Sequence, residues 1–160
     1  MIFFTDFAAH NPHCFQFINE IKKSPYSSVK VTMLGSRTNL CINPSVTQLR
    51  SNTLINERCL ELRQNSATRK KDDEKENNDE DSEKKKKKGK CGFYSSQKVR
   101  DFSSHILSEV QDIEGLVEGA KEAATCPYYS TRAAVPEAEV VMLPYNMLLH
   151  GAQRKSLNVR

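Results

Sequence analysis

The spacing of hydrophobic positions in the first sixty residues predicts a helix followed by a strand. Apolar side chains at 14, 17, 18 and 21 recur at intervals of three and four, as on one face of a helix, and Pro25 ends the pattern. The segment 29–34 alternates and is rich in β-branched residues, which is typical of a buried strand. From 36 to 63 the pattern is irregular, with a short helix expected over about 54–62.

A second apolar pattern covers the last seventy residues. Positions 99, 102, 106, 110, 113 and 117 form one stripe, which predicts a single helix from about 96 to 124, weakened by Gly115 and Gly119. A short helix is expected over 130–134, a buried strand over 140–143 and a final helix over 146–153. Both ends therefore resemble incomplete α/β units, and the middle resembles an inserted module. The predicted fold class is an α/β fragment.

Between these two regions lies a charged insert. Residues 69–90 read RKKDDEKENNDEDSEKKKKKGK and contain no apolar side chain whose burial could offset the entropy of ordering the chain. We expect residues 64–90 to be a solvated, disordered insert. Its Lys84–Lys88 run could also act as a nuclear localisation signal or as a non-specific phosphate contact. The ordered material then falls into two pieces, 1–62 and 91–160, each marginal unless docked or cross-linked.

Composition narrows the function classes. The 160 residues carry a formal net charge of +4, which is compatible with a nucleic-acid partner. No apolar run is long enough to span a membrane, and the N-terminus lacks the features of a signal peptide. In the reducing compartment that this indicates, the five cysteines are expected to be thiols or metal ligands rather than disulfides.

Four cysteines are candidate metal ligands: Cys41, Cys59, Cys91 and Cys126. They are separated by 17, 31 and 34 intervening residues, so no pair has the close spacing of a zinc finger. Spacing alone favours ordinary thiols over a metal site. The Cys126-Pro127 step is a feature of some iron–sulfur ligands, and the four lie in irregular segments where backbone N–H groups can reach sulfur. Both interpretations remain open on spacing.

The short sequence motifs (words) that contain these cysteines resemble those of a known protein family. They read LGSRTNLCINP at 34–44, LINERC at 54–59, CGFY at 91–94 and CPYYSTR at 126–132, followed by VVMLPYNMLLH at 140–150. In this order they closely resemble the iron–sulfur region of the XPD-type, DEAH-box DNA helicases. The long insert between the second and third cysteines, together with the first two words, resembles the chromosome-loss or sister-chromatid-cohesion branch of that family.

The resemblance implies a mostly helical iron–sulfur domain inserted between partial strands and helices of a RecA-like motor domain. It divides the chain into 1–35 (a divergent N-terminus and part of the motor domain), 36–135 (the iron–sulfur domain) and 136–160 (a return into the motor domain). It also implies a nuclear, ATP-dependent 5′-to-3′ DNA helicase acting in repair, replication and cohesion. The expected partners are DNA at a single-strand/duplex junction and the remaining motor domains, with no membrane.

The same resemblance assigns residues. Cys41, Cys59, Cys91 and Cys126 would ligate a 4Fe–4S cluster. Arg37 would lie near the cluster and face DNA phosphates, while Tyr128 would stack on an unpaired base and Arg132 would hold a phosphate. The alternatives are purely structural: Arg37 would be a surface arginine with no functional role, and Tyr128 and Arg132 would pack beside the cluster.

Neither a G-x-x-x-x-G-K-[ST] loop nor a DEAH box occurs in the sequence. ATP hydrolysis in such helicases needs both, because the loop cradles the phosphates and the acidic pair holds Mg²⁺. No residue is therefore assigned as catalytic, and ATP and Mg²⁺ are expected only in a full-length parent. The chain alone is predicted to be inactive. The alternatives are a non-catalytic, metal-bearing DNA-binding module and an inactive truncated product.

Overall fold

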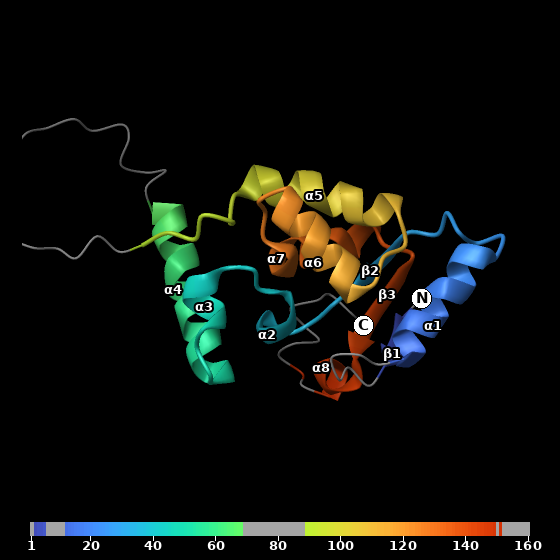
Figure 1. Ribbon diagram of the computed structural model, residues 1–160, viewed down its shortest axis with the longest axis horizontal. Coiled ribbons are helices and arrows are strands. Elements are labelled where there is room, and N and C mark those ends of the chain that lie inside the picture. Colours follow the sequence, from blue (N-terminus) through green and yellow to red (C-terminus); the bar gives the residue numbers. More distant parts are fainter. Residues whose placement is uncertain (1, 6–11, 69–88, 150, 152–160) are drawn as a thin grey trace, which may run out of the picture.

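The computed structural model describes residues 2–5, 12–68, 89–149 and 151, and these are mostly helical with one small sheet (Figure 1). The elements in chain order are β1 (Ile2–Thr5), α1 (Pro12–Lys23), β2 (Val31–Met33), α2 (Arg37–Leu40), α3 (Pro44–Thr47), α4 (Asn52–Thr68), α5 (Ser96–Ser108), α6 (Ile113–Glu122), α7 (Pro127–Ala134), η1 (Val135–Glu137), β3 (Val140–Pro144) and α8 (Tyr145–Leu149).

The sheet has three parallel strands in the order β1-β3-β2. Val31 pairs with Val140 and Ile2 pairs with Val141, so β3 is the central strand. The two predicted strands, 29–34 and 140–143, correspond to β2 and β3, whereas β1 was not predicted. Since everything from α2 to η1 lies between the paired strands β2 and β3, the helical middle of the chain is a crossover between two neighbouring strands. This arrangement confirms an α/β architecture with an inserted helical region.

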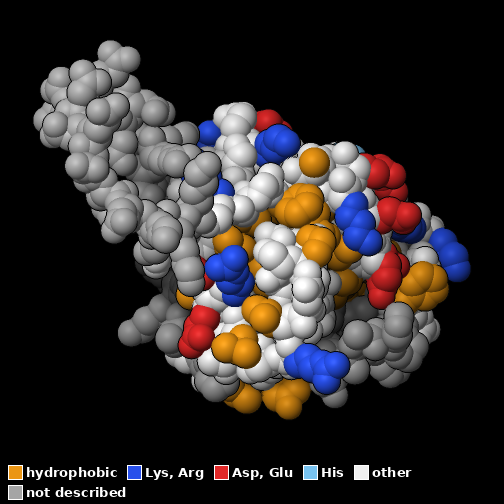
Figure 2. Space-filling view, turned by 60° about the vertical axis from the view of Figure 1, so that its left-hand side comes forward, with side chains coloured by type: hydrophobic (Ala, Val, Ile, Leu, Met, Phe, Trp, Pro, Cys, Tyr) orange, Lys and Arg blue, Asp and Glu red, His pale blue; other side chains and the backbone are white. Residues whose placement is uncertain are grey.

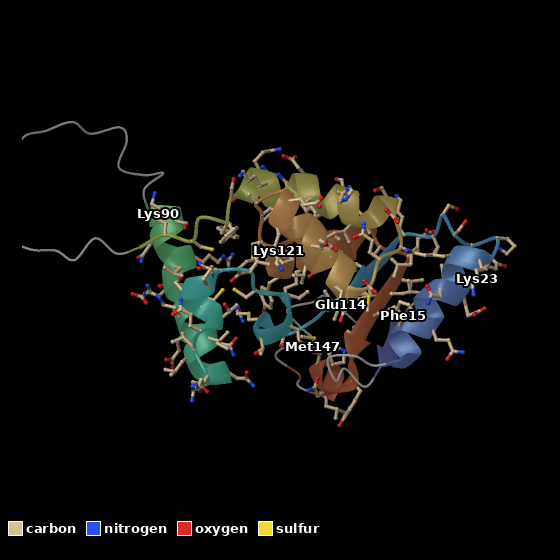
Figure 3. The ribbon with its side chains drawn as sticks, in the orientation of Figure 1. Phe15, Lys23, Lys90, Glu114, Lys121 and Met147 are labelled. Atoms are coloured by element: carbon tan, nitrogen blue, oxygen red, sulfur yellow. The ribbon has the colours of Figure 1, made fainter. Side chains whose placement is uncertain are left out.

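The two faces of the sheet carry different clusters. Successive side chains of a strand point to opposite faces. Accordingly, Val140 and Met142 join the large core, which also holds buried residues of α1, α5 and α6. Val141 and Leu143 pack on the other face with Leu34 and Met147, the latter from α8 (Figure 3). We refer to the sheet with α1 and α5–α8 as the body.

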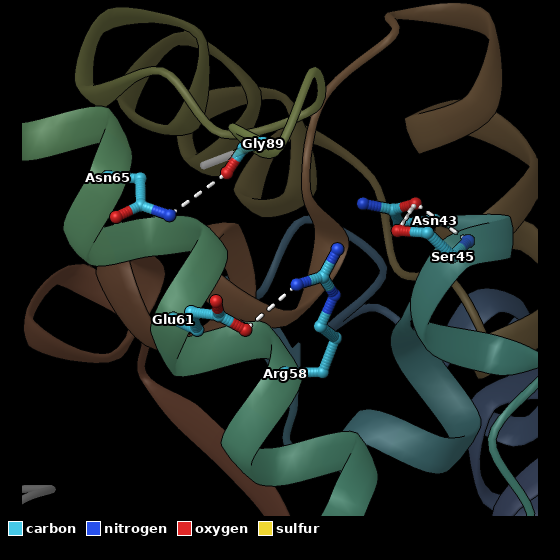
Figure 4. A network of polar contacts seen from close by, with 6 residues as sticks. All are labelled: Asn43, Ser45, Arg58, Glu61, Asn65 and Gly89. Carbon is cyan, nitrogen blue, oxygen red and sulfur yellow. Dashed lines mark hydrogen bonds and ion pairs between the residues drawn. The ribbon is translucent and has the colours of Figure 1, made fainter. Parts of the chain in front are cut away.

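The small lobe consists of α3 and α4. Its core contains only three buried side chains, Val46, Ile55 and Leu62. Asn43 caps α3 by accepting hydrogen bonds from the backbone N–H and the hydroxyl of Ser45 (Figure 4). The short helix α2 connects the lobe to the body, since it contacts α4 on one side and α6 and α7 on the other. In Figure 1 the lobe lies at the opposite end of the molecule from α1.

The prediction of one helix over 96–124 is wrong. Residues 109–112 interrupt it, and the Asp112 side chain accepts a hydrogen bond from Gly115 N at 2.8 Å to start α6. Val110 is buried and Ile113 is partly buried against the large core, so the apolar stripe continues through a segment that is not helical. In this segment the spacing of apolar residues indicates which positions are buried, but it does not indicate a continuous helix.

Two further helices differ from their predicted bounds. The helix α7 begins at Pro127 rather than at 130, because proline is tolerated in the first helical turn and Cys126 takes the extended N-cap position. The helix α4 continues to Thr68, so the predicted disorder of 64–90 is wrong for residues 64–68. Residues 69–88 lie outside the described part of the chain. The two sides of the insert meet where Asn65 Nδ2 donates to Gly89 O at 3.1 Å (Figure 4).

Within the described residues, no helix is both long enough and apolar enough to cross a membrane.

Candidate metal centre

The structure brings the four predicted cysteines to one pocket between the small lobe and the body. Cys41 follows α2, Cys59 lies within α4, Cys91 lies in the segment before α5, and Cys126 is the N-cap of α7. All four line the same small pocket, although up to 85 residues separate them in the sequence. The side chain of Cys126 packs in a cluster with Leu40 and Tyr128, whereas the other three cysteines border the core of the small lobe.

Burial controls the ionisation of these thiols. Burial raises the pKa of Cys126 to about 12, with smaller contributions in the same direction from the three neighbouring cysteines. Burial also raises the pKa of Cys41, with Cys59 and Cys91 adding to the effect. Desolvation and like charges both disfavour the thiolate. Cys41 and Cys126 therefore stay protonated near neutral pH unless a cationic group enters the pocket and stabilises their thiolates.

The donor set of the pocket is made of sulfur alone. Among the residues that the structure describes, its lining contains no His, Asp or Glu, and an all-thiolate set is typical of zinc sites and iron–sulfur clusters. Asn43 Nδ2 donates a hydrogen bond to Cys91 Sγ at 3.6 Å, which is the kind of outer contact that orients a metal ligand. Within the described residues, no three His, Cys, Asp or Glu side chains are grouped closely enough to hold a single metal ion. By the chemistry of its donors, the pocket fits a thiolate-bound metal group.

Arg37 lies beside this pocket, in the first turn of α2. Its guanidinium donates to Asn56 Oδ1 at 3.0 Å and to the Tyr129 hydroxyl at 3.3 Å. It also stacks against the ring of Tyr128, 4.1 Å from the ring centroid. The buried Nε atom has no hydrogen-bond partner among the described residues. Arg37 thus joins α2, α4 and α7, and its side chain is only partly exposed.

Tyr128 and Arg132 are engaged inside the protein. Only 9% of Tyr128 is exposed, and the Arg132 guanidinium lies 3.5 Å from the centroid of its ring. Arg132 donates to Tyr128 O at 3.0 Å and to Gly35 O at 3.1 Å, which ties α7 to the start of α2. Burial lowers the pKa of Arg132. In this arrangement the guanidinium groups of both Arg37 and Arg132 lie against the ring of Tyr128.

Sequence reasoning missed four side chains around the pocket. Tyr94, Tyr129 and Arg63 line it together with the cysteines, and Asn56 holds Arg37. A spacing argument could have found Asn56 and Arg63, since residues three before and four after Cys59 share its face of a helix. Tyr94 and Tyr129 each follow a cysteine by three residues, which was visible in the words CGFY and CPYY.

The surface near the lobe carries both basic and apolar groups. Figure 2, turned so that this side comes forward, shows Lys and Arg side chains interspersed with hydrophobic ones, while most visible acidic side chains lie toward one edge. Leu54 and Leu60 of α4 are exposed by 50% and 42%. Arg58 on the same helix is held by Glu61 at 2.8 Å (Figure 4).

Comparison with known proteins gives consistent matches. Residues 11–160 match the protein family described as DEAD_2. The chain is 48% identical over 146 residues to the "ATP-dependent DNA helicase DDX11" of Homo sapiens, covering 91% of this chain and 15% of that protein. It is 41% identical over 146 residues to the DDX11 of Danio rerio, covering 91% of this chain and 16% of that one.

A fungal relative matches nearly the same length of this chain. The "ATP-dependent DNA helicase chl1" of Schizosaccharomyces pombe is 38% identical over 149 residues, covering 90% of this chain and 15% of that protein. The chain thus spans only 15–16% of the length of these curated relatives.

Proposed function

Because this chain belongs to the DEAD_2 family of XPD-type DNA helicases, in the branch of DDX11 and CHL1, we propose that it is the iron–sulfur segment of an ATP-dependent DNA helicase. One observation carries the proposal. Four cysteines that are far apart in the sequence line a single pocket with no other acidic or imidazole donor. The family match alone does not require the four cysteines to lie close together in space.

The proposed ligands of a 4Fe–4S cluster are Cys41, Cys59, Cys91 and Cys126. When bound, the cluster would cross-link segments of the chain that the small lobe's own core does not hold. Asn43 supports Cys91 through its amide hydrogen bond. The guanidinium groups of Arg37 and Arg63 lie near the cysteines and would offset the negative charge of four thiolates.

We propose that residues 36–135 form the iron–sulfur domain, and that the sheet belongs to the first motor domain. The parent would be a nuclear helicase that moves 5′ to 3′ on DNA and acts in repair, replication and cohesion. ATP and Mg²⁺ would bind in parts of the parent that supply a P-loop and a DEAH box. The 160-residue chain is proposed to be inactive as an ATPase by itself.

The proposed DNA contact is revised from the sequence-based expectation. Arg37 remains a candidate for a phosphate contact, because its side chain is partly exposed beside the pocket. Tyr128 and Arg132 are proposed to support the centre from within, since their rings and donors are already used by protein groups. Substituting Arg37 should therefore weaken DNA binding and its salt dependence, whereas substituting Tyr128 should act through loss of metal.

Anaerobic purification of the chain tests the metal. We expect a brown protein with broad absorption near ~400 nm, which Cys126→Ser abolishes. Cys14, the fifth cysteine, lies outside the predicted ligand set, so Cys14→Ser is the matched control and should leave the absorption unchanged. A colourless protein with one zinc per chain would instead favour the second candidate, a zinc-bearing DNA-binding module, because four thiolates also ligate zinc once they are drawn closer together than in this structure.

A further inference from the structure

Each of the four proposed ligands has a companion side chain three or four residues away, and these companions contact one another. The pairs are Arg37 with Cys41, Arg63 with Cys59, Tyr94 with Cys91 and Tyr129 with Cys126. The four segments are therefore joined twice, once by the thiols around the pocket and once by this outer layer. The contacts of the outer layer are all between protein side chains.

Tyr129 is the centre of the layer. The Arg63 guanidinium lies 4.6 Å from the centroid of its ring, and the Tyr94 ring meets it edge-on with centroids 5.1 Å apart. Its hydroxyl accepts a hydrogen bond from Arg37 Nη2 at 3.3 Å. Both the edge-on geometry and the cation–ring distance lie in the favourable range for such contacts. Tyr129 thus touches the companion of every other cysteine.

The layer also lies at the mouth of the pocket. Arg63 lines the pocket although its side chain is exposed to solvent, so it is located where the pocket meets water. Tyr94 and Tyr129 line the same pocket and are half-buried. Arg63 lies 5.4 Å from the centroid of the Tyr94 ring, so it closes against both tyrosines.

We propose that Tyr129 is a positioning residue that holds the four cysteine-bearing segments together through its contacts with Arg63, Tyr94 and Arg37. Arg63, Tyr94 and Tyr129 stack on one another, and we call these three side chains the aromatic cover. The aromatic cover sets how long the pocket retains its metal. The retention part of this inference rests on the proposed function. The positioning part concerns the protein alone. The ring of Tyr129 carries most of the effect, because four of its contacts involve the ring and one the hydroxyl.

Paired variants of Tyr129 separate ring from hydroxyl. Tyr129→Phe keeps the stacking and loses the Arg37 hydrogen bond, whereas Tyr129→Leu loses both. With the metal-loaded chain and a water-soluble iron chelator, we expect Tyr129→Leu to lose its ~400 nm absorption at least about fivefold faster than wild type, and Tyr129→Phe less than about twofold faster. Equal rates for Leu and wild type would overturn the proposal.

Arg63 gives a second variant that leaves the buried ring in place. Arg63→Ala should speed release about threefold or more, because one exposed cation–ring contact is lost on each tyrosine. The matched control is Arg58→Ala on the same helix, which removes an exposed ion pair with Glu61 and does not line the pocket. Identical release from Arg63→Ala and Arg58→Ala would contradict a cover at this position.

A metal-free measurement keeps this inference distinct from the proposed function. In the metal-free chain, alkylation of each cysteine by N-ethylmaleimide can be followed by mass spectrometry. Cys126 is 6% exposed, so it should react slowly in wild type and several-fold faster in Tyr129→Leu, with Arg58→Ala unchanged. If wild type binds no iron but Tyr129→Leu unmasks Cys126, the proposed function fails and the positioning role stands. If Cys126 is equally protected in both, the positioning role fails.

Discussion

The body and the small lobe achieve their cohesion in different ways. Among the described residues, the body has a core of eleven buried side chains drawn from α1, α5, α6, α7, two strands and the segment between α5 and α6. The small lobe has three, all contributed by α3 and α4. Contacts of α4 with the rest of the described chain run chiefly through α2 and through the cysteine pocket. Ordinary burial suffices for the body, whereas we propose that the lobe depends on a metal group bound by the cysteines.

Removing the metal should produce the largest difference between the small lobe and the body. We expect hydrogen exchange of the α4 amides to accelerate by about a hundredfold or more, since the binding free energy of a structural metal group is folding free energy. The amides of α5 and α7 should keep most of their protection, because their core is apolar and complete without metal. Equal acceleration in both regions, measured by exchange and mass spectrometry, would show that the lobe and the body are one cooperative unit.

A pair of core truncations sharpens the contrast. Ile106 in α5 is 1% exposed and Leu62 in α4 is 2% exposed. Ile106→Ala should lower the free energy of unfolding of the body by about 2–5 kcal/mol with or without metal. Leu62→Ala should accelerate exchange in α4 and leave α5 unchanged. Denaturant unfolding followed with and without iron checks the first, and the second is contradicted if α5 exchange rises as well.

The cap of α6 tests the body alone. Asp112→Ala removes the hydrogen bond to Gly115 N and should lower the free energy of unfolding of the body by about 1 kcal/mol. Asp112→Asn is the matched control, because an asparagine side chain caps a helix about as well. Thermal unfolding measures both. A loss of equal size for Ala and Asn would mean that the charge of Asp112, rather than its cap, is what matters.

The smallest expected effect is a gain. Ala124, directly after α6, has a backbone φ of 46°, a left-handed conformation that favours glycine. Ala124→Gly should therefore raise the free energy of unfolding by about 0.5–1 kcal/mol. The neighbouring Ala123 has φ −74° and ψ −3°, so Ala123→Gly should instead lower it. The same sign for both variants would contradict the assigned strain.

The sequence predicted the two strands and the four-cysteine set because each leaves a local pattern. It failed at 109–112, because Val110 faces the same core as the helices on either side and keeps the helical spacing although it lies between α5 and α6. The predicted DNA contacts of Tyr128 and Arg132 stay predictions. Which side of α7 meets solvent depends on Arg37 and Gly35, which are about ninety residues away in the sequence, and no local pattern encodes that contact.

Native mass spectrometry of the anaerobically prepared chain tests the central claim most directly. We predict one species that is heavier than the bare chain by four irons and four sulfides. This species should be absent from Cys126→Ser and present in Cys14→Ser. A chain that carries a single zinc, or that has the mass of the bare polypeptide under the same conditions, would contradict the claim that these four cysteines hold an iron–sulfur cluster.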